Sequence, residues 1–421
     1  MPGQSSQPIL AVVRQHAEEA AHLRHVRSVL VAAPHVKLHH LRRLDDRIAA
    51  HLDGLAVAGE FGSRLCDAAL ELPGAGEVFC VAICALDDRK VDGLDTVLAI
   101  AAVVPDALTG LVSALGWISA PALKGIVSGL LASSDSFRQR IGITACALHR
   151  VDLGPGLAGL IASPAPALRA RALRCAGEVG RVDLSPVLGS ALKDKDPEAR
   201  FRAAQSAVLL GDRGAALAML RQTAMEPGPF RLPALALALF TADTAAASAL
   251  VKQVASQRED VRFLIRAVGF AGDAARISWL IGLMSDDKLA RLAGESFSFI
   301  TGADLAWLDL EHKPPENFES GPNDNPDDED VAMDEDDGLP WSDQAKVQAW
   351  WAANSHRFQP GVRYFMGAPP TWEHCLRVLK DGYQRQRIAA AHYLCLLRPG
   401  TPLFNCAAPA WRQKRLLERM I

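Results

Sequence analysis

The 421-residue sequence lacks most of the patterns that mark a catalytic centre or a nucleic-acid-binding surface. It contains no G-x-S-x-G motif of serine hydrolases, no phosphate-binding P-loop and no H-E-x-x-H zinc motif. Its net charge of −3 differs from the basic excess that binds nucleic acids and anionic membranes. These absences disfavour serine hydrolases, P-loop enzymes, zinc proteases and nucleic-acid-binding proteins.

Marks of a secreted or membrane protein are also missing. The eight cysteines form no C-x-x-C pair and resemble small core residues of a reducing compartment. The N-terminus lacks a basic start followed by an apolar run and a small-residue cleavage site. Pro105 and Asp106 divide the apolar residues 97–118 into runs too short to cross about 30 Å of hydrocarbon. We therefore expect a cytoplasmic protein without a membrane span, and two buried helices that meet at Pro105.

What the sequence does contain is a repeat with a period of 31 residues. An arginine, a second arginine two positions later and a run of small residues recur at this spacing. The residues in register are Arg138 and Arg140, Arg169 and Arg171, Arg200 and Arg202, Arg231, Arg262, and Ala145, Ala176 and Ala207. Hydrophobic residues make up 49% of the chain, and Ala and Leu dominate them, which favours helices.

One period predicts two short helices. Asp196 and Pro197 are typical of a helix start, because Asp caps free amides and Pro at the first helical position loses no hydrogen bond. Gly211 is typical of a helix end, and a second helix is expected over residues 213–225. A helix pair of this size cannot bury its own apolar face, so successive pairs are expected to stack.

The register also accounts for a G-x-G-x-x-G pattern at Gly154, Gly156 and Gly159. A dinucleotide site needs a strand before this pattern and a helix behind it. Residues 151–157 and 182–188 share the pattern V-D-L-x-P-x-L one repeat apart, and the later copy lacks these glycines. We therefore predict that the glycines belong to an ordinary turn of the repeat.

The Asp-Pro start, the R-x-x-A-A core and the Gly-Asp end resemble the bacterial HEAT-like helical repeat. The resemblance covers residues 106–302 well and residues 61–105 only by continuity. It implies an all-α fold, an α-solenoid of stacked helix pairs. The parts we predict are a helical N-terminal cap (1–60), the solenoid (61–310), an acidic flexible insertion (311–342) and a C-terminal helical unit that continues the solenoid (343–421). The cap is expected from helically spaced apolar residues at Leu41, Leu44, Ile48, Leu52 and Leu55.

The repeated arginines have two interpretations. Residues i and i+2 of a helix point about 200° apart, so Arg200 and Arg202 cannot both face one ligand. The HEAT-like resemblance implies that such an arginine pairs with an acid or a carbonyl group of a neighbouring repeat. A basic ridge for an anionic partner is the alternative. In either case we expect Arg138, Arg169 and Arg200 to occupy equivalent sites.

The first quarter of the chain is rich in histidine. His35 and His39 lie four residues apart, a spacing at which two helical histidines can bind one metal ion. No carboxylate lies at a matching spacing, so solvated or capping histidines are the expected role. We accordingly predict no metal and no cofactor.

Acidic residues crowd the segment that follows the repeats. They lie among Pro, Asn and Gly with almost nothing apolar to bury, and their spacing does not fit a calcium-binding loop. We expect a flexible, solvated insertion, with a tether for a basic partner as the alternative. Deletion of residues 314–338 is then expected to shift the melting temperature by only a few degrees.

The C-terminal region combines a further repeat with a cluster of aromatic and arginine side chains. The segment R-Q-R-I-A-A-A-H-Y-L at residues 385–394 repeats the arginine and alanine skeleton. Aromatic residues and arginine often anchor protein interfaces, and the candidate interface residues are Trp350, Trp351, Arg357, Arg363 and Tyr364. The alternative is that this cluster packs onto the last repeats and only completes the core.

Three longer phrases carry a narrower resemblance. They are L-D-D-R-I-A-A-H-L-D-G-L-A-V-A-G at 44–59, A-G-E-S-F-S-F-I-T-G-A-D-L at 293–305 and A-W-W-A-A-N-S-H-R-F-Q-P-G-V-R-Y-F-M-G at 349–367. Together they resemble a family of Gram-negative bacterial proteins whose genes lie near type VI secretion components and their toxin-loading adaptors. The resemblance implies a cellular context and no active site.

These observations favour a non-enzymatic scaffold for protein partners, such as an adaptor or chaperone that loads a secreted effector. One alternative is a HEAT-like repeat enzyme. Helical-repeat hydroxylases that resemble this fold bind iron through His-Glu dipeptides, which the chain lacks, whereas only the absence of a recognisable site argues against a bilin lyase. A nucleic-acid-binding solenoid is the other alternative, and it needs a basic channel that the net charge of −3 does not favour.

Overall fold

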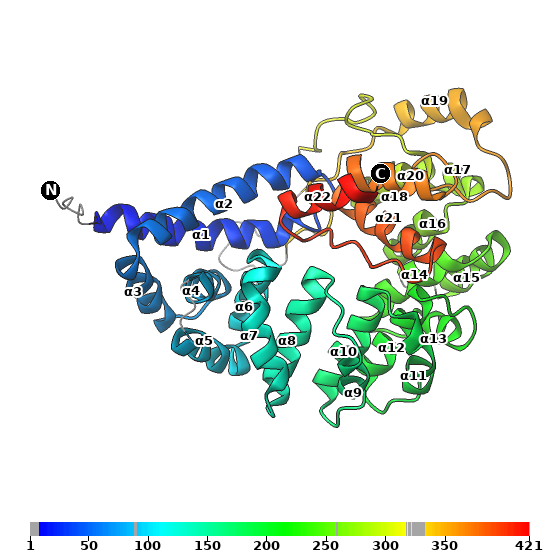
Figure 1. Cartoon of the computed structure of the whole chain (residues 1–421). Helices are drawn as coiled ribbons and strands as arrows, with labels where there is room; N and C mark the ends of the chain where they lie inside the picture. The colour runs from blue at the N-terminus through cyan, green and yellow to red at the C-terminus, as the bar shows by residue number, and fades with distance from the viewer. Residues whose placement is uncertain are drawn as a thin grey trace. The chain divides into compact units, whose positions relative to one another are not determined.

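The computed structural model describes residues 8–87, 91–257, 260–316, 318, 321 and 333–420 (Figure 1). In these residues all regular structure is helical, and β-pairing is limited to isolated bridges such as that between Asp273 and Arg363. No helix in these ranges combines the length and the hydropathy that crossing a membrane requires. The prediction of an all-α fold made of stacked helix pairs is confirmed.

The chain forms two compact units. Unit 1 comprises residues 1–32, 36–187 and 402–421, and unit 2 comprises residues 33–35 and 188–401. Helix α11 (Ser185–Ala191) contains the boundary between them.

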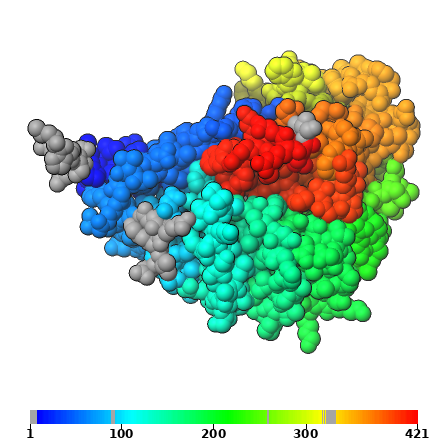
Figure 2. All heavy atoms as spheres, in the orientation of Figure 1, coloured from blue at the N-terminus to red at the C-terminus, as the bar shows by residue number. Residues whose placement is uncertain are grey.

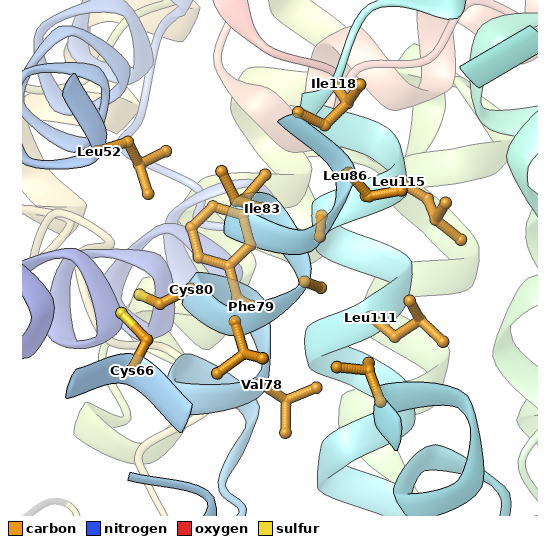
Figure 3. Close-up of a cluster of buried hydrophobic side chains, with 14 of the residues drawn as sticks. Leu52, Cys66, Val78, Phe79, Cys80, Ile83, Leu86, Leu111, Leu115 and Ile118 are labelled. Atoms are coloured by element: carbon orange, nitrogen blue, oxygen red, sulfur yellow. The ribbon is translucent and has the colours of Figure 1, made fainter. Parts of the chain in front are cut away.

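Unit 1 is built around a hydrophobic helix, α4 (Ala75–Asp87), whose apolar residues point in all directions. Such a helix must be covered on every side. Figure 3 shows Phe79, Cys80 and Ile83 of α4 between side chains of the surrounding helices. The other helices of unit 1 are α1 (Leu10–Leu30), α2 (Leu38–Ala58), α3 (Glu60–Ala68), η1 (Ala69–Glu71), α5 (Val91–Val103), α6 (Pro105–Trp117), α7 (Ala120–Ala132), α8 (Ser136–His149), α9 (Gly156–Ile161), α10 (Pro166–Val179), η2 (Val182–Leu184) and α22 (Ala410–Met420).

Two local predictions for unit 1 are confirmed. The apolar stretch over residues 97–118 contributes two helices, α5 and α6, and Pro105 is the first residue of the second one. The apolar residues of the expected cap, from Leu41 to Leu55, lie on α2 and are buried. The prediction that three glycines belong to a turn holds only for Gly154, which lies in a turn with φ of +63°, where glycine is favoured. Gly156 and Gly159 lie in α9, and no strand precedes them.

Unit 2 continues the helical repeat. The first helices of successive pairs are largely buried, whereas the second helices have an exposed side. The helices of unit 2 are α12 (Pro197–Leu209), α13 (Ala215–Thr223), α14 (Arg231–Thr241), α15 (Thr244–Ser256), α16 (Val261–Ala271), η3 (Ala274–Arg276), α17 (Ile277–Leu283), α18 (Asp287–Thr301), α19 (Gln344–Asn354), η4 (Ser355–Arg357), α20 (Trp372–Asp381) and α21 (Gln384–Leu397).

Two of the repeated arginines fasten their helices to the preceding turns. Nη1 of Arg169 donates to the carbonyl oxygen of Ser163 at 2.8 Å, and Nη1 of Arg200 donates to that of Asp194 at 2.7 Å. These two contacts are equivalent one repeat apart, as predicted. Arg138 departs from the prediction, since it pairs with Asp95 of α5 at 2.8 Å. All three contacts fit the structural role that the HEAT-like resemblance implies.

The C-terminal region differs from the prediction that residues 343–421 continue the solenoid. Residues 343–401 belong to unit 2, but the chain from residue 402 onward packs in unit 1 (Figure 2). There α22 lies against α2, and the backbone N–H of Ala410 donates to Asp45 at 2.6 Å. Periodicity reports only local structure, so it could not predict this long-range return of the chain.

In unit 1 the returning segment reaches the C-terminal ends of three helices. The N–H of Leu403 donates to the carbonyl oxygen of Glu178 in α10 at 3.0 Å, and Asn405 donates to that of Leu148 in α8 at 3.1 Å. Arg412 donates to the carbonyl oxygen of Trp117 in α6. The last carbonyl groups of a helix have no partner within it, so this segment caps these helices.

Candidate protein-interaction surface

The predicted aromatic cluster lies on α19 and on the loop that follows it in unit 2. Trp350 and Trp351 are neighbours on the helix and point about 100° apart. The ring of Trp350 meets Phe297 of α18 edge-on, with the centroids 5.6 Å apart, and the ring of Trp351 lies 5.2 Å from that of Phe358. Both tryptophans are half-buried, so each packs one side of its ring and leaves part of it at the surface.

The three remaining candidates have different surroundings. Arg357 is exposed and donates to the side chain of Asn354 at 3.1 Å. Arg363 instead donates to the carbonyl oxygen of Phe240 at 2.9 Å, at the end of α14. Tyr364 is buried, and its backbone N–H donates to the carbonyl oxygen of Gly272 at 2.8 Å. Arg363 and Tyr364 therefore hold the loop on the repeats, and Arg357 is the candidate that faces solvent.

Two glycines allow this loop to approach the helix ends. Gly272 and Gly302 follow α16 and α18 with φ of +70° and +73°, the usual conformation of a glycine that ends a helix. A Cβ atom at Gly302 would lie 2.6 Å from the carbonyl oxygen of Met366. The loop also donates from the N–H of Met366 to Phe299 of α18 at 2.7 Å. Glycine is thus required both for the turn and for the close approach of the loop.

The face formed by the first helices of unit 2 is covered by the chain itself. Helix α21 packs against α12 and α14, and the loop after α19 reaches the ends of α14, α16 and α18. A partner therefore has less access to this face than a bare repeat array offers.

An exposed tryptophan was not among the residues predicted from sequence. Trp307, in the turn after α18, is 86% exposed, and its neighbour Leu308 is 41% exposed. The N–H of Leu308 donates to the carbonyl oxygen of Asp304 at 3.0 Å, and the Asp304 carboxylate accepts from Tyr383 at 2.9 Å. Asp309 pairs with Lys346 in the first turn of α19 at 3.4 Å. An ordered turn therefore presents Trp307 beside α19.

A row of arginines in unit 2 is paired with the end of the acidic segment. Arg262 and Arg266 of α16 contact Asp336 and Glu335 at 2.6 and 2.9 Å. Arg291 of α18 contacts Asp334 at 2.6 Å. The hydrogen bond from Arg266 lowers the pKa of the Glu335 carboxyl. The chain thus supplies its own acids to this arginine ridge. Of its members, only Arg262 belongs to the repeated arginines for which the sequence suggested an anionic partner as an alternative.

These contacts change the expectation of a flexible insertion over residues 311–342. Asp336 and Trp341 are buried, and the Arg291 guanidinium lies 4.5 Å above the ring of Trp341. The described end of the segment is therefore packed, and a deletion up to residue 338 would remove its ion pairs. Residues 317, 319–320 and 322–332 lie outside the described residues.

The histidine pair is not arranged as a metal centre. His35 lies against Gly338, where an added Cβ would clash with its ring, and the His39 ring lies 4.0 Å from that of His40. In the ranges that the structure describes, no three His, Cys, Asp or Glu side chains are grouped so that they could hold an ion.

A comparison with known protein families identifies one part of the chain. The sequence model of HEAT repeats matches residues 155–239, which include α10, α12 and α13. No curated protein and no solved structure matches the chain. The match and the stacked helix pairs support the description of this chain as a HEAT-like repeat protein.

Proposed function

We propose that this chain is a non-enzymatic binding scaffold for a protein partner. HEAT repeats generally serve as protein-interaction scaffolds. The observation that carries the proposal is the exposure of Trp307 on an ordered turn, since tryptophan is enriched among the residues that dominate binding energy. We call Trp307, Leu308 and the solvent-facing parts of Trp350, Trp351 and Arg357 the aromatic surface.

The finer proposal is that the partner is an effector or adaptor of a type VI secretion system, bound in the cytoplasm before secretion. Its support is the resemblance of residues 44–59, 293–305 and 349–367 to proteins encoded near such systems. Trp350, Trp351 and Arg357 lie within the last of these phrases, and Trp307 follows the second phrase by two residues.

The test compares Trp307→Ala with Val103→Ala in the tagged full-length chain. Val103 is 78% exposed and lies in unit 1, so it controls for loss of an exposed apolar side chain. Partners are captured from the native organism, identified by mass spectrometry and re-bound as purified proteins. We expect Trp307→Ala to weaken binding by about 2 kcal/mol or more, with an unchanged melting temperature.

Two results would contradict the proposal. Equal binding of both variants would exclude Trp307 from the interface. A captured effector that binds the isolated wild-type chain no better than an unrelated protein would exclude the secretion role.

A further inference from the structure

A small cavity in unit 1 has features of a ligand site that the scaffold role does not use. It encloses about 220 Å³ between α1, α6, the end of α8 and residues 405–409. Its walls are largely apolar, and the apolar side chains that line it include Val31, Ile48, Phe79, Val112, Trp117 and Leu148. Pockets for drug-sized ligands start at about 300 Å³, so a smaller molecule fits here.

Arg24 gives this apolar cavity a positive charge. Its side chain, on α1, is only 6% exposed. Nε and Nη2 donate to the Ser113 hydroxyl at 3.2 and 2.7 Å, and Nη2 also donates to the Thr109 carbonyl oxygen at 3.4 Å. No carboxylate in the described parts of the chain lies within ion-pair distance of this guanidinium, and Nη1 makes no hydrogen bond with these residues. A buried guanidinium without an acid is costly, and a bound anion would compensate for it.

Two more arginines add to the positive charge. Arg27 also lines the cavity, but it pairs with the buried carboxylate of Asp45 at 2.5 Å and donates to the carbonyl oxygens of Ala407 and Ala408 at 3.0 Å. Arg412 of α22 donates to the carbonyl oxygens of Trp117 and Ile118, but its buried Nη1 has no hydrogen-bond partner. Burial, Arg415 and Arg27 lower the pKa of Arg412 to about 10. Three guanidinium groups thus lie near the cavity. Among the described residues, only Arg27 has a carboxylate as an ion-pair partner.

Burial and the nearby Arg27 also lower the pKa of Arg24, and Asp106 opposes them with a smaller effect. The arrangement differs from an ordinary structural salt bridge, in which each cation has its own acid.

We propose that this cavity binds a small organic carboxylate. The carboxylate faces Nη1 of Arg24, because a guanidinium group forms charge-assisted hydrogen bonds with carboxylates and Nη1 donates to none of the described residues. The apolar body of the ligand lies against Phe79 and Trp117. The site adds a ligand to the proposed scaffold and does not depend on a protein partner.

The first experiment measures binding of 3-phenylpropionate to the full chain by calorimetry and by thermal shift. Its neutral amide and inorganic phosphate are the matched probes. We expect saturable binding of the carboxylate, a higher melting temperature and affinities about tenfold or more weaker for the amide and for phosphate. No binding, or equal binding of the amide or of phosphate, would overturn the proposal.

Two variants test separately what the charge of Arg24 and the free volume of the cavity contribute to binding. Arg24→Gln removes the charge, and Gly116→Leu fills the cavity while both arginines remain. A Cβ at Gly116 would lie 3.6 Å from Leu148, an ordinary contact distance, so there is room to begin a side chain. Both variants should weaken binding of 3-phenylpropionate by about tenfold or more, and Arg42→Gln, which alters an exposed arginine, should not.

Circular dichroism checks that each variant is folded. If Arg24→Gln does not fold, Gly116→Leu decides the outcome. Unimpaired binding to folded Gly116→Leu would show that the ligand lies elsewhere and would overturn the proposal.

Discussion

The arginine clusters of the two units differ in how many acids accompany them. In unit 2 the arginine ridge meets three consecutive acids of the segment 334–336. In unit 1, Arg27 pairs with Asp45, whereas Arg24 and Arg412 form no ion pair with the residues that the structure describes. The first arrangement neutralises its own charge and leaves little for an outside anion. The second keeps a surplus of positive charge beside a cavity, so the local supply of acids separates a structural cluster from a candidate ligand site.

The largest expected effect is loss of Asp45, the acid that pairs with Arg27 in unit 1. Asp45 is fully buried and also accepts the N–H of Ala410. Asp45→Asn leaves the Arg27 guanidinium without its carboxylate and should reduce the free energy of unfolding by about 3–5 kcal/mol. Asp46→Asn is the control, because Asp46 is 53% exposed and pairs with an exposed arginine. Hydrogen exchange in α2 and α22 measures both, and equal effects would remove the contrast between the units.

The next effect is a dependence of stability on pH in α10. Burial would raise the pKa of Glu178, but Arg171, Arg174 and Arg150 together lower it to about 2. The folded pKa is below the unfolded value, so the carboxylate stabilises the fold above about pH 4.3, and this contribution is lost as the pH falls through 2. It amounts to about 3 kcal/mol. Urea unfolding of the wild type and of Glu178→Gln should show a difference that narrows at acid pH, and a constant difference would contradict this assignment.

A smaller effect is expected for the buried acid of unit 2. Asp336 is 2% exposed, but its partner Arg262 is 30% exposed and also lies 3.6 Å from Glu335. Asp336→Asn should therefore cost about 2 kcal/mol, because the freed guanidinium keeps water and a second acid. Hydrogen exchange in α16 measures the change. A loss as large as that for Asp45→Asn would show that Glu335 does not compensate for the loss of Asp336 as a partner of Arg262.

The smallest effect is expected for Glu335, the most exposed of the acids that pair with the arginine ridge. Glu335 is 66% exposed, so Glu335→Gln should change the stability by about 1 kcal/mol or less. The difference from the wild type should shrink further in high salt, which screens exposed ion pairs. Urea unfolding at two salt concentrations measures this, and salt-independence would indicate that the pair is shielded from solvent.

The parts of the fold that sequence predicted are those that depend on local signals. The period of 31 residues, the start at Asp196 and Pro197 and the break at Pro105 all report on neighbouring residues. The equivalence of Arg169 and Arg200 followed for the same reason. The return of the C-terminal segment did not, since the contact between Asp45 and Ala410 joins residues 365 positions apart.

The candidate sites also combine features that local sequence predicts with features that depend on long-range contacts. Composition singled out the aromatic residues near Trp350, but only the structure separates Arg357, which faces solvent, from Arg363, which caps a helix. Trp307 lies in a turn without periodicity, and its exposure has no counterpart in the sequence pattern. The surplus charge near Arg24 depends on which distant side chains approach it, and no spacing in the sequence predicts that.

The contacts of residues 363–367 in unit 2 and 403–412 in unit 1 limit how this protein can be assembled and can evolve. These residues leave the ribosome after the helices that they cap, so those helix ends have only water or chaperones as partners until the capping residues are synthesised. Repeat arrays commonly change length by duplication of a unit. Here an added unit would displace a helix end from the residues that cap it, so the capping segments constrain the number of repeats.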